Sequence, residues 1–319
     1  MDLPPGYRLR APVIEDGPAI ADMLNEETLA LTGVPVASVE WVTTAWTAPG
    51  ARLDRDFGVI TDSGGAIAGY FLIDFEPPLT TMTVIGAVAL SHHNRGIGSA
   101  IIDEVLRRGR ELAAGRDDVT LRMGVLAGEP RVAALLTANG FREVRVFWSM
   151  TVRFDGPPPP PADVAGITVR TLVPGQEREV YRCAAAAFED HWGDGFSSEQ
   201  SWLHRHVDAS DSFDPELWYL AWEGERLVGV LLASAESEED PELGYVGWLG
   251  VIREARGRGI GEALLRRSFV RFYELGKRGA QLVVDSESST GADRLYERVG
   301  MTPRPRFANW DRPLNPPGA

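Results

Sequence analysis

Two stretches of this chain repeat one pattern, in which an apolar, strand-like segment leads through a basic, glycine-rich turn into an amphipathic helix. The second copy spans residues 250–265 and the first spans residues 87–100. Similar segments precede and follow each copy in the same order. The sequence therefore predicts one α/β fold built twice, and 319 residues suffice for two domains of ordinary size.

A proline-rich stretch separates the two copies. Five consecutive prolines, residues 157–161, follow Gly156. Proline lacks a backbone donor and favours an extended polyproline conformation, so this stretch suits neither a helix nor an interior strand. We predict an N-terminal domain at residues 1–154, a linker at residues 155–165 and a C-terminal domain at residues 166–319.

Hydrophobic periodicity predicts the same order of elements in both halves. In the first half we expect strands at 7–10, 57–60, 67–75, 84–90 and 119–125, a strand pair within 141–154, and helices at 15–28, 99–113 and 131–138. In the second half we expect strands at 167–170, 218–222, 227–235, 244–251 and 281–285, and helices at 177–188, 261–275 and 291–298.

The turn of the second copy, from Arg256 to Gly261, suits a ligand that bears phosphate groups. Backbone N–H groups of a turn and of a helix N-terminus can together face a pyrophosphate. Glycines permit close approach and positive φ, and Arg256 and Arg258 would add charge-assisted hydrogen bonds. A dinucleotide is the alternative ligand, but Gly257, Gly259 and Gly261 lack the Gly-x-Gly-x-x-Gly spacing, and no Walker A sequence is present.

Charge and cysteine content exclude several classes of function. A net charge of −14 and a pI near 4.9 would repel a nucleic acid and attract a cationic substrate. No apolar run approaches the roughly 20 residues that cross a bilayer, and residues 1–5 lack the features of a signal peptide, so we expect a cytoplasmic protein with no membrane partner. The single cysteine, Cys183, excludes an intrachain disulfide and a Cys-rich metal site, and its flanks predict a buried thiol in a helix.

The turn sequence Arg256-Gly257-Arg258-Gly259-Ile260-Gly261, after a strand that ends in Val251, resembles the acyl-CoA motif of the GCN5-related N-acetyltransferase (GNAT) family. The resemblance covers nearly the whole of both halves. It implies two tandem acyltransferase domains, each a mixed, twisted sheet flanked by helices and splayed between its fourth and fifth strands. Acyl-CoA would lie in that gap, with its pantetheine along the strand edge and its pyrophosphate on the turn. The coenzyme-binding residues that the resemblance implies are Leu249, Val251, Arg256, Gly257, Arg258, Gly259, Ile260 and Gly261.

Two further segments, residues 188–192 and residues 290–300, are similar to those of tandem acetyltransferases of the mycothiol-synthase type. In similar proteins the region that begins at the end of the first of these segments lines the acceptor side of the gap. A metal site is not expected there, because the i, i+2 spacing of His204 and His206 would place them on different faces of a helix. This region carries His191, Trp192, Trp202, His204 and His206.

The resemblance also implies catalytic residues. Tyr296 stands where the family often has the general acid that protonates the coenzyme thiolate, and the alternative role is packing of its helix against the sheet. Glu242, the acidic residue nearest the fourth strand, is our choice of general base. Asp285, at the end of the fifth strand, is the second candidate, and its alternative role is to bind the substrate ammonium. Glu242 belongs to an acidic run before the strand, which comprises Glu236, Glu238, Glu239, Asp240 and Glu242. An acidic run of this kind more often forms a solvated loop.

The first half departs from the family pattern at two positions. Counted back from the matching glycines Gly140 and Gly300, the equivalent of Tyr296 is Leu136, which cannot donate a proton. His93 stands where the motif has arginine or glutamine, and a tolerated surface variant explains it better than a catalytic base. We therefore expect a catalytic C-terminal domain and a degenerate N-terminal domain.

These expectations combine into an N-acetyltransferase that moves an acetyl group from acetyl-CoA to the primary amine of a small molecule by direct attack in a ternary complex, with no metal. An unperturbed alkyl amine, with a pKa of roughly 10.4, is neutral only about one part in 10³ at pH 7, so a base is useful. A noncatalytic acyl-CoA-binding protein and a protein lysine or N-terminal acetyltransferase are the alternatives. The sequence predicts no oligomeric state.

Overall fold

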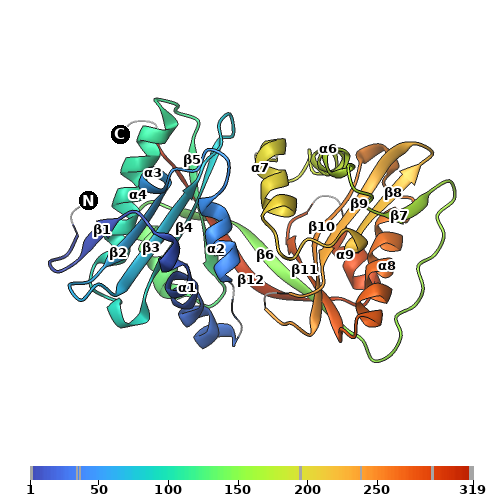
Figure 1. The fold of residues 1–319 in the computed structure, drawn as a ribbon, viewed down its shortest axis with the longest axis horizontal. Helices are drawn as coiled ribbons and strands as arrows, with labels where there is room; N and C mark the ends of the chain where they lie inside the picture. The colour runs from blue at the N-terminus through green and yellow to red at the C-terminus, as the bar shows by residue number, and fades with distance from the viewer. Residues whose placement is uncertain are drawn as a thin grey trace. The chain divides into compact units, whose positions relative to one another are not determined.

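The computed structural model describes residues 3–33, 35, 37–193, 196–237, 239–288 and 291–315. The chain divides into two compact units, of which the first comprises Met1–Arg145 with Phe307–Ala319 and the second comprises Val146–Arg306 (Figure 1). Glu238 of the acidic run and Thr290 of the segment 290–300 lie outside the described residues.

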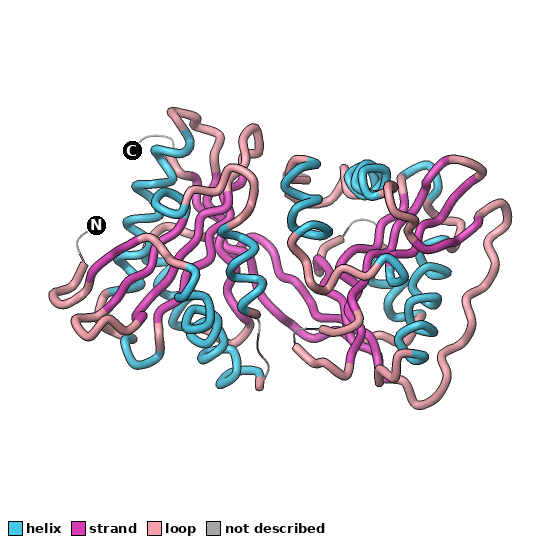
Figure 2. The backbone as a smooth tube through the Cα atoms, viewed as in Figure 1, coloured by secondary structure: helices cyan, strands magenta, loops and turns pink. Residues whose placement is uncertain are grey.

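The first unit is a sheet of the order β1-β2-β3-β4-β5-β12 with helices on both faces (Figure 2). Strands β1 to β4 are antiparallel neighbours, β4 and β5 are parallel, and β12 is antiparallel to β5. Its elements are β1 (Arg8–Arg10), α1 (Gly17–Thr32), α2 (Val39–Trp46), α3 (Leu53–Asp56), β2 (Phe57–Thr61), β3 (Ile67–Asp74), β4 (Thr81–Val88), α4 (Ile97–Ala113), β5 (Thr120–Leu126), α5 (Pro130–Ala138) and β12 (Thr302–Pro313).

The second unit repeats this order as β7-β8-β9-β10-β11-β6. Strands β7 to β10 are antiparallel neighbours, β10 and β11 are parallel, and β6 is antiparallel to β11. Its elements are β6 (Arg142–Arg153), β7 (Thr168–Thr171), α6 (Glu177–Ala187), α7 (Glu199–Leu203), the π-helical turn η3 (His204–Asp208), β8 (Trp218–Glu223), β9 (Arg226–Ser234), β10 (Leu243–Val251), the 3₁₀ turn η5 (Arg253–Ala255), α8 (Ile260–Glu274), β11 (Gly279–Asp285) and α9 (Ala292–Arg298).

Each unit therefore takes its last strand from the other half of the sequence. Strand β6, which follows the helices of the first unit, pairs with β11 of the second, and the C-terminal strand β12 returns to β5 of the first. Arg122 of β5 and Asp311 of β12 face each other in this register, and the guanidinium donates two hydrogen bonds of 2.8 Å to the carboxylate. The chain passes from one unit to the other near residues 145 and 306 and not at the linker. The predicted domain boundaries are corrected accordingly.

The expected strand pair within residues 141–154 is also corrected, because the segment forms the single strand β6. Its sequence, REVRVFWSMTVR, contains none of the Gly, Pro, Asn or Asp residues that build tight turns, so the strand continues without reversing. Residues 157–161, in the predicted linker, adopt neither helix nor strand, and they lie within the second unit and not between the two units.

Neighbouring residues on central strands pack on opposite faces of each sheet. In the first unit, Tyr70 belongs to a core cluster with α1 and α2, whereas Phe71 belongs to a cluster with α4. In the second unit, a Cβ at Gly250 would meet Ala187 at the end of α6, whereas Val251 approaches the start of α8 at Gly261. Among the described residues, no helix combines the length and the apolar character needed to cross a membrane.

Candidate functional site

Strand β10 is paired on both sides at its start and on one side at its end. Leu243–Val246 pairs in parallel with Gly279–Leu282, and the register against β9 then shifts at Gly247. Beyond that point, among the described strands, Trp248–Val251 pairs with β9 alone, while β11 stays with β6. We call the backbone edge of Trp248–Val251 that points away from β9 the open edge. It lies at the predicted splay between the fourth and fifth strands of the unit.

Backbone groups of Leu249 and Val251 point toward the open edge. The N–H of Ile252 donates to the carbonyl of Val228 at 3.0 Å, so Ile252 and Gly250 are the hydrogen-bonded positions against β9. In an antiparallel pair, the alternate residues direct both their N–H and C=O groups to the other side. Leu249 thus presents both of its backbone groups, and Val251 its N–H, to an added extended segment, while the Val251 carbonyl accepts a bond from Arg256.

The glycine turn continues directly from this edge. Gly257 has φ 76° and Gly259, the N-cap of α8, has φ 84°, values that cost a residue with a Cβ about 1–2 kcal/mol. Apart from the glycine and its two chain neighbours, no atom of the described residues lies within 4 Å of the position that a Cβ would occupy at either glycine. The turn is open there, and the backbone N–H groups at the start of α8 suit an anion. Ile260 is buried and anchors the helix start.

Arg256 binds protein groups instead of facing the turn. Its two terminal nitrogens donate to the carboxylate of Asp190 at 2.6 and 2.8 Å, and Nε donates to the carbonyl of Val251 at 3.0 Å. These bonds hold the pKa of Asp190 at about 2, far below its usual range. The prediction that Arg256 binds the pyrophosphate does not fit this arrangement, because its donors are committed elsewhere.

Arg258 is held more loosely than Arg256. It pairs with Glu223 at 2.8 Å, and both side chains are at least one-third exposed. An exposed pair of this kind contributes roughly 0–1 kcal/mol, so a phosphate can replace Glu223 at little cost. Arg258 fits the predicted role of a phosphate-binding side chain.

The first unit builds the same turn with other residues. Asn94 and Gly96 have φ 59° and 83°, and Gly96 is the N-cap of α4, as Gly259 is of α8. His93 takes the place of Arg256, and its Nε2 lies 2.9 Å from the carbonyl of Val88, the last residue of β4. The turn conformation is thus common to both units, while the side chains around it differ.

Tyr296 lies on α9, which packs against the first turn of α8. A Cβ at Gly261 would lie 3.3 Å from Leu295, so glycine permits this close approach. Tyr296 is buried in a core cluster with Leu282 and Val284 of β11. Burial raises the pKa of Tyr296 to about 12, so its phenol stays protonated at neutral pH.

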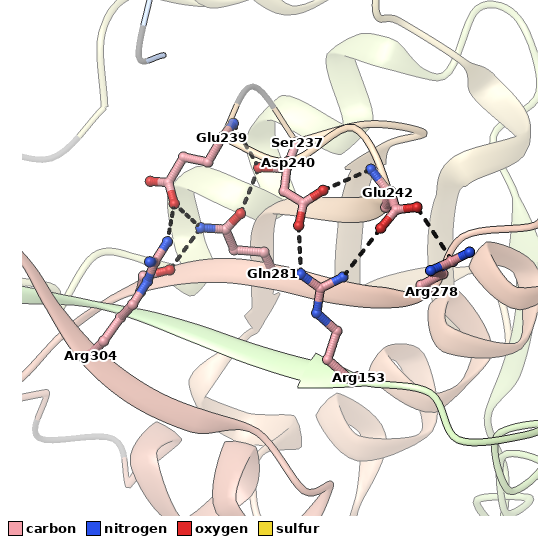
Figure 3. Close-up of polar contacts among 9 residues, drawn as sticks. Arg153, Ser237, Glu239, Asp240, Glu242, Arg278, Gln281 and Arg304 are labelled. Carbon is pink, nitrogen blue, oxygen red and sulfur yellow. Dashed lines mark hydrogen bonds and ion pairs between the residues drawn. The ribbon is translucent and has the colours of Figure 1, made fainter. Parts of the chain in front are cut away.

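Glu242 lies at the closed end of the β10–β11 pair, opposite to the open edge. Its carbonyl accepts the N–H of Arg278, and its carboxylate lies 3.3 Å from the Arg278 guanidinium and 4.0 Å from that of Arg153 (Figure 3). The five strand positions between Glu242 and Trp248, at about 3.3 Å each, keep its carboxylate away from the open edge. The structure therefore does not bring Glu242 together with Tyr296 and the turn.

The described members of the acidic run are ion-paired, and they range from the buried Glu239 to the exposed Glu236 and Glu242. Glu239 is buried and lies 2.6 Å from Arg304 and 2.7 Å from Arg306. Asp240 pairs with Arg153 at 2.6 Å, and Glu236 pairs with Lys277 at 2.8 Å. The partners all belong to the second unit: Arg153 lies on β6, Arg304 and Arg306 lie in the part of β12 before residue 307, and Lys277 precedes β11. The run therefore connects segments that are distant in sequence.

A buried amide joins this run to the sheet. The Gln281 amide nitrogen donates to Ser149 of β6 and to Glu239, and its oxygen accepts from Ser237 at 2.6 Å (Figure 3). All four side chains are buried. The network crosses from β11 to the exchanged strand β6 and to the loop before β10, which makes it a structural connection at the closed end.

Asp285 lies where β11 ends, at the same end of the strand pair as the open edge. It is 4% exposed, and its Oδ1 accepts the backbone N–H of Glu287 at 2.9 Å. Of the two carboxylates that the sequence offered as a base, Asp285 is the one at the open end.

Aromatic side chains cover the α6 face of the open edge. Trp248 contacts Phe188, Phe196 and His206, with ring centroids 5.2, 4.9 and 5.9 Å apart. His206 belongs to the π-helical turn η3 and is partly buried, and this burial lowers its pKa to about 4 and keeps it neutral. The predicted acceptor-side residues His206 and Trp202 thus pack together, with ring centroids 4.9 Å apart.

Two further predicted acceptor-side residues, Trp192 and His191, also make aromatic contacts. Trp192 contacts Phe147 of β6 with centroids 6.3 Å apart, and His191 contacts Phe188 with centroids 5.4 Å apart.

Cys183 is buried on α6, as predicted, and burial raises its pKa to about 12. The role of Asp190 escaped the sequence analysis, because no local pattern couples it to a residue that lies on another element.

Known proteins are similar to this chain in sequence and in fold. The model of the acetyltransferase (GNAT) family matches residues 178–301. Mycothiol acetyltransferase of Geodermatophilus obscurus is 31% identical over 261 residues, which cover 79% of this chain and 80% of that protein. The mycothiol acetyltransferase of Catenulispora acidiphila is 26% identical and covers 93% of this chain and 91% of its own length.

Solved structures of acetyltransferases are also similar to this chain in fold. A GCN5-related N-acetyltransferase from Sphaerobacter thermophilus superposes with a TM-score of 0.77 at 33% identity, covering 99% of this chain and 98% of the other. A tandem GNAT protein from the clavulanic acid biosynthesis pathway shares the fold at 20% identity, with a TM-score of 0.71 and coverage of 97% and 99%.

Proposed function

This chain is an N-acetyltransferase that belongs to the acetyltransferase (GNAT) family, and from that premise we propose that it moves an acetyl group from acetyl-CoA to the primary amine of a small molecule. The amine attacks the thioester directly while both substrates are bound. An acyl-CoA cosubstrate is general to the family, whereas its acetyl group and the small amine are the specific parts of this proposal.

The observation that carries the proposal is the continuity of the open edge with the glycine turn. Among the described strands, the N–H and C=O of Leu249 and the N–H of Val251 face away from β9 without a strand partner, and the turn at Gly257 and Gly259 leads into the N-terminus of α8. A pantetheine arm has amides that can pair with a strand edge, and its pyrophosphate suits the turn. Acetyl-CoA bound in this way extends along β10, with its nucleotide end beside Arg258.

Tyr296 acts as the general acid in this proposal. When the C–S bond breaks, the thiolate takes the phenolic proton and leaves as CoA-SH, and the phenolate is reprotonated from solvent. A pKa of about 12 suits a donor that must be protonated before each turnover. Leu136 of the first unit cannot do this, so we assign catalysis to the second unit and regard the first as a degenerate domain.

Asp285 replaces Glu242 as the proposed base. The amine nitrogen forms a bond to the thioester carbon, and its proton passes to the Asp285 carboxylate directly or through water. Support comes from position, since Asp285 is buried at the open end of the strand pair and Glu242 is held by Arg278 at the closed end. Strand β10 itself, LGYVGWLGV, carries no carboxylate.

The acceptor is proposed as a small amine because of the aromatic cluster around Trp248. A negative protein with aromatic rings beside the open edge attracts a compact cationic amine before it loses its proton. The relatives are named mycothiol acetyltransferases, so mycothiol-related amines are the first acceptors to test.

The test is a titration followed by a screen. Acetyl-CoA titrated into the full chain by calorimetry should give a coenzyme site that Gly259→Val abolishes, and acetylation of a panel of small amines should follow with release of free thiol. A lysine-bearing peptide belongs in the panel to test the protein acceptor. Binding of acetyl-CoA without transfer to any amine would favour a noncatalytic acyl-CoA-binding protein, and absence of binding would overturn the proposal.

A further inference from the structure

The carbonyl of Val251 is the last acceptor on the open edge, and it is taken by the protein. It points to the same side as the backbone groups of Leu249, because Ile252 bonds to β9. Arg256 Nε donates to it at 3.0 Å. An extended ligand on this edge can therefore use the N–H and C=O of Leu249 and the N–H of Val251, but not the Val251 carbonyl.

Arg256 is itself fixed from the α6 side. Its Nη1 and Nη2 form two bonds with Asp190, and Nη2 also donates to the carbonyl of Ala187 at 2.8 Å. Four of the five N–H donors of the guanidinium thus have protein acceptors. Both side chains are about a quarter exposed, at 28% for Arg256 and 25% for Asp190. The pair ties the end of α6 to the end of β10 and to the start of the turn.

In the first unit, different residues bond to the matching carbonyl, which is that of Val88 at the end of β4. His93 Nδ1 lies 2.9 Å from Arg131 Nη1, and a guanidinium can only donate, so Nε2 carries the proton and donates to the carbonyl of Val88. Arg131 lies in turn 3.6 Å from the carboxylate of Glu129. Both units therefore cap the carbonyl that ends the strand with an N–H donor linked to a carboxylate. The common feature is this bond and not a positive charge at the first position of the turn.

We propose that Asp190 and Arg256 form a strand-end clamp that positions the coenzyme site and does not bind phosphate. The clamp ends the pairing edge at Val251 and holds the turn at Gly257 and Gly259 in register with the strand. This inference rests on the proposed function, because it names the residues that shape the acyl-CoA edge. Phosphate binding falls to the turn backbone and Arg258.

Two acetyl donors distinguish a positioning role of Asp190 and Arg256 from direct phosphate binding. Acetyl-CoA carries the pyrophosphate, whereas S-acetyl-pantetheine has the same thioester and amides but no phosphate. Asp190→Asn and Arg256→Lys each break the clamp with little change in size. We expect each variant to lose kcat/KM with both donors by a similar factor, on the order of tenfold, the factor that one lost interaction of about 1.4 kcal/mol gives.

A direct phosphate contact predicts the opposite pattern. Arg256→Lys would then retain binding of acetyl-CoA, since lysine keeps the charge, and Asp190→Asn would tighten it by removing a competing carboxylate. Either result overturns the clamp. Arg258→Gln is the reference for a phosphate contact, and its loss should be confined to acetyl-CoA and should shrink as salt is raised.

Folding and the proposed function are checked in the same series. Circular dichroism and thermal melting identify folded variants, and calorimetric binding of CoA and of pantetheine repeats the comparison on any variant too slow to assay. A wild-type chain that binds acetyl-CoA no more tightly than the Asp190→Asn and Arg256→Lys variants overturns the clamp alone. A wild-type chain that binds neither acetyl-CoA nor S-acetyl-pantetheine overturns the proposed function and the clamp with it.

Discussion

Tyr296 and Leu136 occupy the same backbone position in their two units. The N–H of Met301 donates to the carbonyl of Tyr296 at 3.0 Å, and the N–H of Phe141 donates to the carbonyl of Leu136 at 3.0 Å. Both side chains are buried at the end of a short helix that follows the fifth strand of the unit. One fold thus carries a phenol at this position in the second unit and an aliphatic group in the first.

Removal of the Tyr296 hydroxyl should slow turnover without weakening coenzyme binding. We expect Tyr296→Phe to lower kcat by about 10²- to 10⁴-fold, the range for a general acid, while the affinity for acetyl-CoA is unchanged. Steady-state kinetics and calorimetry measure the two effects. Tyr219→Phe, at another buried tyrosine of the same unit, is the matched control and should keep wild-type kcat. Unchanged kcat in Tyr296→Phe would remove this residue from the mechanism.

Burial of Tyr296 should make the chain less stable in alkali. Its pKa is raised to about 12 in the folded state from 10.0 when unfolded. Below pH 10 both states hold the proton, whereas between pH 10 and 12 only the unfolded state releases it, so stability falls as pH rises. At about 1.4 kcal/mol for each unit of pKa, the loss approaches 2–3 kcal/mol near pH 12. Urea unfolding at pH 8 and pH 11.5 should show a smaller loss in Tyr296→Phe, and equal losses would contradict the assignment.

Two glycines with positive φ, one in the turn before α8 and one after α8, allow a matched pair of substitutions. Gly259 has φ 84° and Gly276, after α8, has φ 80°. At both positions a Cβ would meet no atom within 4 Å among the described residues beyond its chain neighbours. Alanine should therefore destabilise the chain by about 1–2 kcal/mol at both sites. Only Gly259→Ala should also weaken acetyl-CoA binding, on the order of tenfold or more, because it reshapes the turn. Calorimetry shows whether the two variants differ, and equal affinities would count against a phosphate site at the turn.

Asp285 and Glu242 can be distinguished by isosteric amides. Asp285→Asn should lower kcat/KM by about 10²- to 10⁴-fold, as expected when a general base is lost, whereas Glu242→Gln should leave it unchanged. The reason is position: Asp285 lies at the open end of the strand pair and Glu242 pairs with Arg278 at the closed end. Rates with a small amine acceptor provide the measurement. The reverse pattern would return the base to Glu242.

Gln281 should be important for stability and not for chemistry. Gln281→Leu removes the partner of Ser149, Ser237 and Glu239 in a buried site and should cost about 2–4 kcal/mol. Gln200→Leu, at an exposed position of α7, is the matched control and should change stability by no more than about 0.5 kcal/mol. Urea unfolding monitored by fluorescence measures both. Equal stabilities would show that the network contributes little to the fold.

Most elements of the repeat were predictable, because local sequence determines them. Strand β3 and helix α8 begin and end within one residue of their expected bounds, since apolar periodicity and turn glycines act over short distances. Helix α2 was not predicted, although Ser38 caps it and Trp46 lies on its buried side, and neither was the C-terminal strand β12. Their patterns are short or are interrupted by prolines, so packing determines them.

By itself, the sequence determined the doubled fold, the turn at Gly257 and Gly259, and the difference between Tyr296 and Leu136. Each of these follows from residue type and spacing along a short piece of chain. Only the tertiary structure decided which half β6 and β12 would complete, because every strand edge offers the same backbone donors and acceptors. Only the tertiary structure also joined Arg256 to Asp190 and set Glu242 apart from the open edge, since these partners meet through pairing between segments that are distant in sequence.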